Sequence, residues 1–111
     1  MSTQVTLGEF EQLVLLAILR LGDNAYGVTI RHEITKRTNR EATPGALYTT
    51  LDRLEDKGML RSTMGDPTPE RGGRAKRYFE VTGAGMKAIT QSQKNYQQMR
   101  KGLRLPGLSN A

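Results

Sequence analysis

Residues 43–51, TPGALYTTL, carry the strongest helix-start signal in the chain. Thr43 suits the N-cap, where its hydroxyl can accept a hydrogen bond from a backbone N–H of the first turn, and Pro44 suits the first helical position. Most helices place Asp or Glu in this turn, because its unpaired N–H groups act as a partial positive charge. This segment has no acid before Asp52. The sequence therefore predicts a helix whose first turns are uncharged.

The two faces of this helix differ in chemistry. Three leucines at helical spacing are predicted to be buried: Leu47, Leu51 and Leu54. The exposed face is small or polar and uncharged: Gly45, Ala46, Tyr48 and Thr49. This face suits a polyanion, because phosphates are attracted to a helix N-terminus, glycine permits close approach and hydroxyl groups donate hydrogen bonds. The alternative is an ordinary half-buried helix that lacks acids by chance.

Composition limits the partners and the chemistry. A chain of 111 residues with a net charge of +6 favours one domain that binds nucleic acid or another anionic surface. The absence of cysteine and the single His32 exclude disulfides and the usual zinc clusters. The longest apolar run, residues 13–19, is too short for a bilayer, which needs about 18 residues. The N-terminus lacks the features of a signal peptide, so we expect a cytoplasmic protein.

Two helices are predicted before residue 43. The first follows a capping box of Thr6 and Glu9, with Val5 and Phe10 as its hydrophobic staple, and ends at Gly22. The second is predicted to begin at a cap on Asp23 or Asn24, to bury Tyr26, Ile30 and Ile34, and to fray near Asn39.

A β-hairpin is predicted after the third helix. Gly58 is placed to end that helix in the left-handed conformation, with Met59 contacting Leu54. Residues 60–65 and 76–82 are predicted to be short strands, and the second alternates in polarity as strands do. The Pro- and Gly-rich residues 66–75 form the loop between them.

A last helix is predicted over residues 83–103, capped by Thr82 and terminated by Pro106. Its apolar positions form a narrow seam typical of helix pairing: Ile89, Tyr96, Met99 and Leu103. We expect this seam to pair two subunits; the alternative is that it packs within its own domain.

The order of three helices and a basic hairpin predicts a mainly α fold with a small β-hairpin, the winged helix-turn-helix. We expect a DNA-binding domain over residues 1–82, and a dimerisation helix and tail over residues 83–111.

Four motifs resemble the PadR family of bacterial transcriptional regulators. They are the apolar run 13–19, Ala25-Tyr26-Gly27-Val28, the Pro44-Gly45-Ala46-Leu47-Tyr48 element with Leu51-Arg53-Leu54-Glu55 and Gly58 after it, and Gly73-Arg74-Ala75-Lys76-Arg77-Tyr78-Phe79 with Thr82 and Gly85. The resemblance covers residues 7–103 and is to a short form with one C-terminal helix. It implies a homodimeric repressor that binds a palindromic operator through the third helix and the wing. It also leaves room for a small-molecule effector, although the last helix has only Tyr96 as an aromatic.

The chemistry of the third helix gives its residues separate roles. Thr49, Gly45 and Ala46 are placed to approach base edges, and Thr43 caps the helix beside them. The resemblance assigns the Tyr48 hydroxyl to a phosphate; the alternative is a core tyrosine. Arg53 is predicted either to reach DNA or to pair with Glu55 or Asp56.

The wing contributes the cations Arg71, Arg74 and Lys76 beside two glycines, which suits phosphate or minor-groove contact. The alternative is a solvated charge run.

No arrangement of nucleophile, base or paired carboxylates is evident, so we predict neither an enzyme nor a cofactor or metal requirement. The competing interpretation is a winged-helix protein-interaction module without specific DNA binding.

Overall fold

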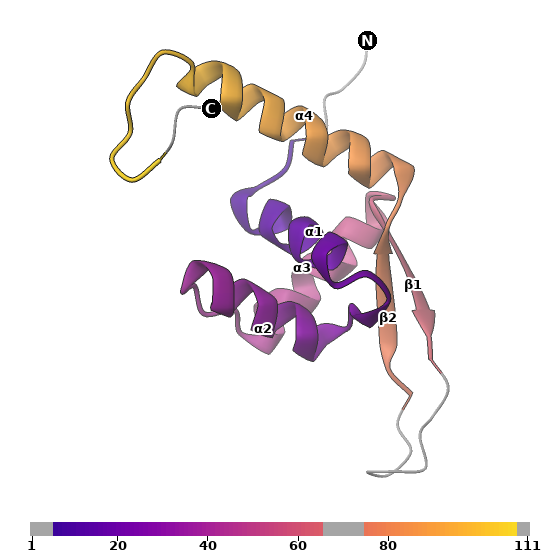
Figure 1. Cartoon of the computed structure of the whole chain (residues 1–111). Coiled ribbons are helices and arrows are strands. Elements are labelled where there is room, and N and C mark those ends of the chain that lie inside the picture. The colour runs from indigo at the N-terminus through magenta and orange to yellow at the C-terminus, as the bar shows by residue number, and fades with distance from the viewer. Residues whose placement is uncertain (1–5, 66–74, 109–111) are drawn as a thin grey trace.

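The computed structural model describes residues 6–65 and 75–108, as a body of three helices with a hairpin on one side and a long last helix across it (Figure 1). The elements follow in the order α1 (Glu9–Leu21), a 3-10 turn (Gly22–Asn24), α2 (Gly27–Thr38), α3 (Pro44–Asp56), β1 (Leu60–Met64), β2 (Arg77–Val81) and α4 (Gly83–Arg100). The predicted mainly helical fold with one hairpin is confirmed. Within these ranges, no helix is long and apolar enough to cross a membrane.

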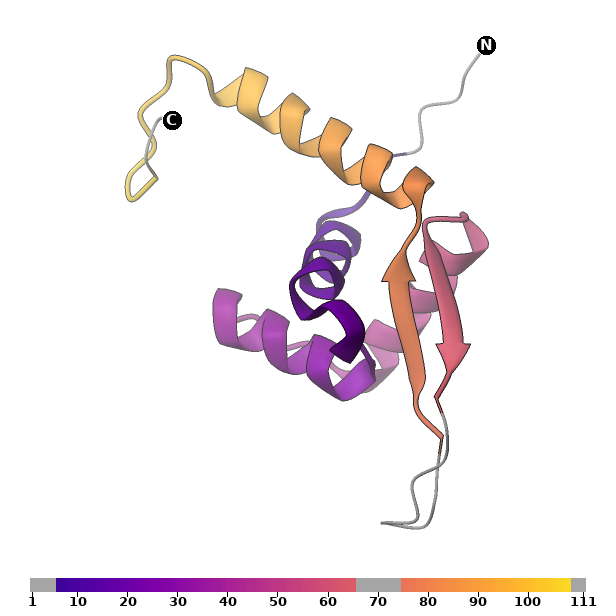
Figure 2. The ribbon, with the colours of Figure 1, turned by 45° about the vertical axis from the view of Figure 1, so that its right-hand side comes forward.

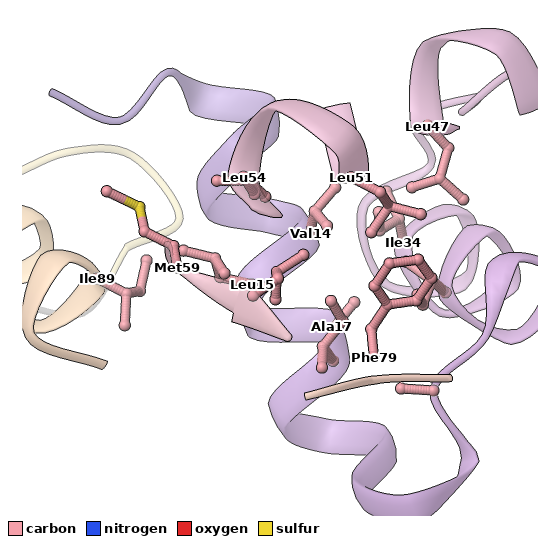
Figure 3. Close-up of a cluster of buried hydrophobic side chains, with 14 of the residues drawn as sticks. Val14, Leu15, Ala17, Ile34, Leu47, Leu51, Leu54, Met59, Phe79 and Ile89 are labelled. Atoms are coloured by element: carbon pink, nitrogen blue, oxygen red, sulfur yellow. The ribbon is translucent and has the colours of Figure 1, made fainter. Parts of the chain in front are cut away.

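The core lies where α1, α2 and α3 meet and is closed by side chains from both strands of the hairpin and by Ile89 of α4 (Figure 3). Leu15, Leu47 and Leu51 are fully buried, and Phe79 of β2 and Ile89 of α4 are almost so. Each such side chain stabilises the fold by roughly 1.5–3 kcal/mol relative to an exposed one. The predicted leucine stripe of α3 is thus confirmed as its packing face.

The start of α1 differs from the prediction. Gly8 is the N-cap, and its N–H donates to Glu11 Oε1 at 2.8 Å, so the predicted capping box of Thr6 and Glu9 is wrong. The reason is that Glu11 is held from two sides, since Lys57 Nζ also donates to Glu11 Oε2 at 2.9 Å. Val5 of the predicted staple lies outside the described residues. The predicted end of α1 at Gly22 is confirmed.

The start of α2 also differs. Its N-cap is Tyr26, so the predicted cap on Asp23 or Asn24 is wrong. The Ala25 carbonyl accepts a hydrogen bond from the Phe79 N–H of β2 at 2.9 Å, and Ala25 is therefore extended. The helix begins only after this contact, where the Tyr26 N–H donates to Thr29 Oγ1 at 3.0 Å.

The turn from α3 into the hairpin follows the prediction. Gly58 has a φ of 78°, and the N–H groups of Gly58 and Met59 donate to the carbonyls of Glu55 and Leu54, both at 2.9 Å. This is the predicted left-handed helix end. The antiparallel register then runs from Leu60 opposite Val81 to Met64 opposite Arg77.

The beginning of α4 is built on a glycine. Thr82 caps the helix by accepting from the Gly85 N–H at 3.1 Å, as predicted. A Cβ at position 85 would lie 2.3 Å from the Met59 carbonyl oxygen, so only glycine allows α4 to pack on the turn before β1. The helix ends at Arg100 and not at Leu103, because the chain turns at Gly102 with a φ of 85° before Pro106 is reached. The C-terminal half of α4 extends away from the three-helix body (Figures 1 and 2).

Candidate nucleic-acid interface

The N-terminal face of α3 is open to solvent, as its sequence predicts. Thr43 Oγ1 accepts a hydrogen bond from the Ala46 N–H at 3.2 Å. Gly45, Ala46 and Thr49 are exposed, and Tyr48 keeps 45% of its surface in solvent. The backbone and side chains of these two turns are therefore accessible to a large ligand.

The Tyr48 hydroxyl lies against the first residue of α2. A Cβ at Gly27 would fall 2.2 Å from Tyr48 Oη, so the glycine makes room for the hydroxyl. The ring is half-exposed and not part of the core, which disagrees with the alternative of a core tyrosine. This contact places the Tyr48 hydroxyl beside the first turn of α2.

A side chain of α2 holds the segment that leads into α3, a contact that could not be predicted from the sequence. Arg31 of α2 donates from Nε to the carbonyl of Ala42 at 2.8 Å, directly before the N-cap Thr43. It holds the connection between the two helices, and no sequence spacing predicts a bond from a side chain to this carbonyl.

The structure describes the two strands of the wing and Lys76 directly before the second strand. Lys76 is exposed, and its Nζ lies 4.3 Å from the centre of the Tyr26 ring, which meets the Tyr78 ring edge-on at 5.5 Å between centres. Lys76 is therefore located beside the start of α2. Arg71 and Arg74 lie outside the described residues, so their predicted roles stay predictions.

Arg53 is exposed on α3. Glu55, one of its two predicted acidic partners, pairs with Arg77 of β2, and the described part of the chain contains no ion pair of Arg53 with Glu55 or Asp56. The predicted pairing of Arg53 with Glu55 or Asp56 is therefore not seen.

The end of α3 is tied to α1 by an ion pair. Burial raises the pKa of the Glu11 carboxyl, but hydrogen bonds from Lys57 and the Gly8 N–H, together with the charges of Lys57 and Arg53, outweigh burial and hold this pKa below its ordinary value. Glu11 is thus ionised where it meets α3.

The predicted dimer seam is split by the structure. Ile89 is 3% exposed and packs in its own core, so its assignment to a seam between subunits is wrong, and the alternative of packing within the domain holds for this residue. Tyr96 and Met99 are 51% and 79% exposed, and Leu103 is exposed beyond the end of α4. The helical spacing alone predicts one seam, but Ile89 packs against the core of its own chain, whereas Tyr96, Met99 and Leu103 are exposed to solvent.

A groove between α1 and α4 adjoins this exposed half. It has a volume of about 310 Å³, and its apolar lining is Leu16, Leu19, Met86 and Ile89. Leu16, Leu19 and Met86 are exposed, because no side chain within residues 6–65 and 75–108 covers them.

Solved structures with the same arrangement define the class of fold. A transcriptional regulator from Clostridium thermocellum superimposes with a TM-score of 0.68 at 24% identity, over 81% of this chain and 84% of that one. A PadR family transcription regulator from Clostridium difficile gives 0.67 at 20% identity, over 82% and 91%. A winged-helix DNA-binding protein from STIV gives 0.62 at 23% identity, over 85% and 95%. The fold is therefore a winged helix.

The family follows from a sequence model. The model of the transcriptional regulator PadR-like family matches residues 15–91, from the middle of α1 into α4. This is more than half of the chain, and the chain belongs to this family. It is a PadR-like transcriptional regulator and not an enzyme.

Proposed function

We propose that this regulator is a repressor that binds a palindromic operator in double-stranded DNA as a homodimer, in the cytoplasm. The observation that carries the proposal is the exposed and uncharged N-terminal face of α3, beside the start of α2 and the base of the wing. A net charge of +6 supports a polyanionic partner.

Each part of this surface has a proposed task. Gly45, Ala46 and Thr49 approach base edges in the major groove, next to the cap at Thr43, and Ala46 offers apolar contact to a thymine methyl group. Cations and one hydroxyl meet phosphates: Tyr48, Arg53, Arg71, Arg74 and Lys76. The base contacts give specificity, and the phosphate contacts give most of the salt-dependent affinity.

Selection from genomic DNA tests this function. Sheared genomic fragments are passed over the immobilised full chain, and the retained fragments are sequenced. We expect enrichment of one palindromic sequence. Retention without a common sequence, or no retention, would contradict specific recognition and favour a winged-helix protein-interaction module.

The homodimer is proposed from the exposed apolar surface of α4. Tyr96, Met99 and Leu103 lie on or beyond the part of the helix that extends from the body, and the groove with Leu16 and Met86 adjoins it. A second copy would cover this surface. A two-fold dimer would place two recognition helices roughly 34 Å or a multiple apart, as a palindrome requires.

Charge introduction at Met99 tests the dimer. Met99→Glu should place an unpaired carboxylate in the interface and weaken association by on the order of 3 kcal/mol. Gln98→Glu, at the exposed residue directly before Met99 on the same helix, is the control with the same change of charge. Sedimentation velocity at low micromolar concentration should show a wild-type dimer, a Gln98→Glu dimer and a Met99→Glu monomer. A wild-type monomer, or a Met99→Glu dimer, would rule out this interface.

A further inference from the structure

One guanidinium joins the wing to α3. Arg77, the first residue of β2, donates from Nε to Ser62 Oγ at 3.2 Å, from Nη1 to Asp52 Oδ1 at 3.3 Å, and from Nη2 to Glu55 Oε1. Ser62 Oγ donates to Glu55 Oε2 at 2.8 Å. The guanidinium carbon lies 4.9 Å from the centre of the buried Phe79 ring. We refer to Arg77, Asp52, Glu55 and Ser62 as the α3–wing clamp.

The clamp is located at a junction of the proposed DNA-binding elements. Asp52 follows Tyr48 and Thr49 by one helical turn, and Glu55 follows Asp52 by three residues on the same side of α3. Arg77 is opposite Met64, in the last pair of the described ladder. The clamp therefore ties the C-terminal part of α3 to the place where the hairpin leaves the body.

We propose that Arg77 is a positioning residue for DNA binding, which fixes the wing relative to α3 and offsets part of the negative charge of the two carboxylates nearest the face that meets DNA. This inference rests on the proposed function. A guanidinium presents donors on three nitrogens fixed in one plane, whereas the three donors of a lysine ammonium all lie on one nitrogen. Without it, Asp52 and Glu55 would repel the phosphates that Tyr48 and Arg53 are proposed to bind.

Two other roles for Arg77 fit the geometry less well. As a phosphate ligand, Arg77 would have to release both carboxylates, which together carry twice its charge. As a stabilising ion pair alone, it would contribute little, because partly exposed pairs are worth about 0–1 kcal/mol.

A matched pair of variants separates position from charge. Arg77→Gln removes the clamp, whereas Arg61→Gln removes the same charge from the same hairpin, where Arg61 pairs with Glu80 at 2.9 Å and does not reach α3. Affinity for the duplex enriched from genomic DNA should fall on the order of tenfold with Arg77→Gln, with a shallower salt dependence, and by less than about threefold with Arg61→Gln. Equal losses in the two variants would overturn the proposal, because charge alone would then explain both.

A measurement without DNA tests the positioning itself. Residual dipolar couplings of β1–β2 and α3 amides should fit one alignment tensor in the wild type and in Arg61→Gln, and two different tensors in Arg77→Gln. A single tensor in Arg77→Gln would overturn the proposal. If Arg77→Gln does not fold, Asp52→Asn removes one anchor and should give the same changes in smaller measure. Wild-type protein that retains no duplex would overturn the proposed function and this inference together, whereas equal binding by wild type and Arg77→Gln would overturn only the inference.

Discussion

The two ends of α3 are held in different ways. The C-terminal end is fixed by backbone hydrogen bonds at Gly58 and Met59, by Lys57 to Glu11 of α1, and by Glu55 to Arg77 of β2. The N-terminal end has its cap at Thr43 and a contact between Tyr48 and α2, and its outer face is exposed. One end of the helix is therefore anchored by the fold, and the other is free to meet a ligand.

This difference shows how one short helix can serve both stability and recognition. The anchors at the C-terminal end and the leucines beneath it fix the direction of the helix. The exposed residues of the first two turns then need not stabilise the fold, and their side chains are free to contact a ligand. Substitutions in the two sets should accordingly affect different properties.

The largest expected effect is on folding, from the buried face of α3. Leu51 is fully buried, so Leu51→Ala should lower the free energy of unfolding by about 2–5 kcal/mol. Urea denaturation followed by circular dichroism measures this change. Thr49→Ala, two residues away on the exposed face, is the control and should change it by less than about 0.5 kcal/mol. A similar loss of unfolding free energy in both variants would contradict the distinction between a buried, stabilising face and an exposed face of α3.

Recognition should show the reverse pattern. Thr49→Ala should cost on the order of 1–3 kcal/mol in binding to the enriched operator and little on a scrambled duplex of the same length. Fluorescence anisotropy with both duplexes at one salt concentration measures the two affinities. An equal loss on both duplexes would mean that Thr49 does not read bases.

The anchor at the C-terminal end should make stability depend on pH. Because the folded-state pKa of Glu11 lies below its ordinary value of 4.5, the unfolded chain binds this proton more tightly. The stabilisation is present above about pH 4.5 and is lost as pH falls through the folded-state pKa. Glu11→Gln should cost roughly 1 kcal/mol at pH 7 and flatten the acid limb of the stability profile.

Urea denaturation at several pH values between 3 and 7 checks this dependence. Glu80→Gln removes an exposed carboxylate from β2 and is the control. If the free energy of unfolding of Glu11→Gln falls between pH 5 and pH 3 as steeply as that of the wild type, other groups cause the loss of stability in acid.

The smallest expected change in stability concerns Tyr48. Tyr48→Phe keeps the half-exposed ring and removes the hydroxyl, so the Tm should stay nearly unchanged while DNA binding weakens by about 1 kcal/mol. Differential scanning calorimetry and anisotropy measure the two quantities. A Tm lower by several degrees with unchanged binding would assign the hydroxyl to its contact at Gly27 instead of to a phosphate.

Features that depend on neighbours in sequence could be predicted. The cap at Thr43, the left-handed Gly58 and the cap at Thr82 are each satisfied within a few residues, and the structure confirms them. The two strands and the leucine stripe follow from period and composition in the same way.

Features that depend on distant contacts could not be predicted. The start of α2 is set by a hydrogen bond between Ala25 and Phe79, and the seam of α4 is divided because Ile89 meets the core of its own chain. Arg77 reaches acceptors on α3 and β1 that no local pattern connects to it. The N-terminal face of α3 is exposed as predicted, whereas its contacts with DNA stay predictions.

The central claim, specific recognition of DNA by α3 and the wing, is tested most directly by the salt dependence of operator binding. Affinities of the full chain for the enriched duplex and for its scrambled counterpart are measured between 50 and about 300 mM salt. We predict that the logarithm of both affinities falls steeply with the logarithm of salt concentration, while the enriched duplex stays at least about a thousandfold preferred. Equal affinities for the two duplexes, or affinities that do not change with salt, would contradict the account.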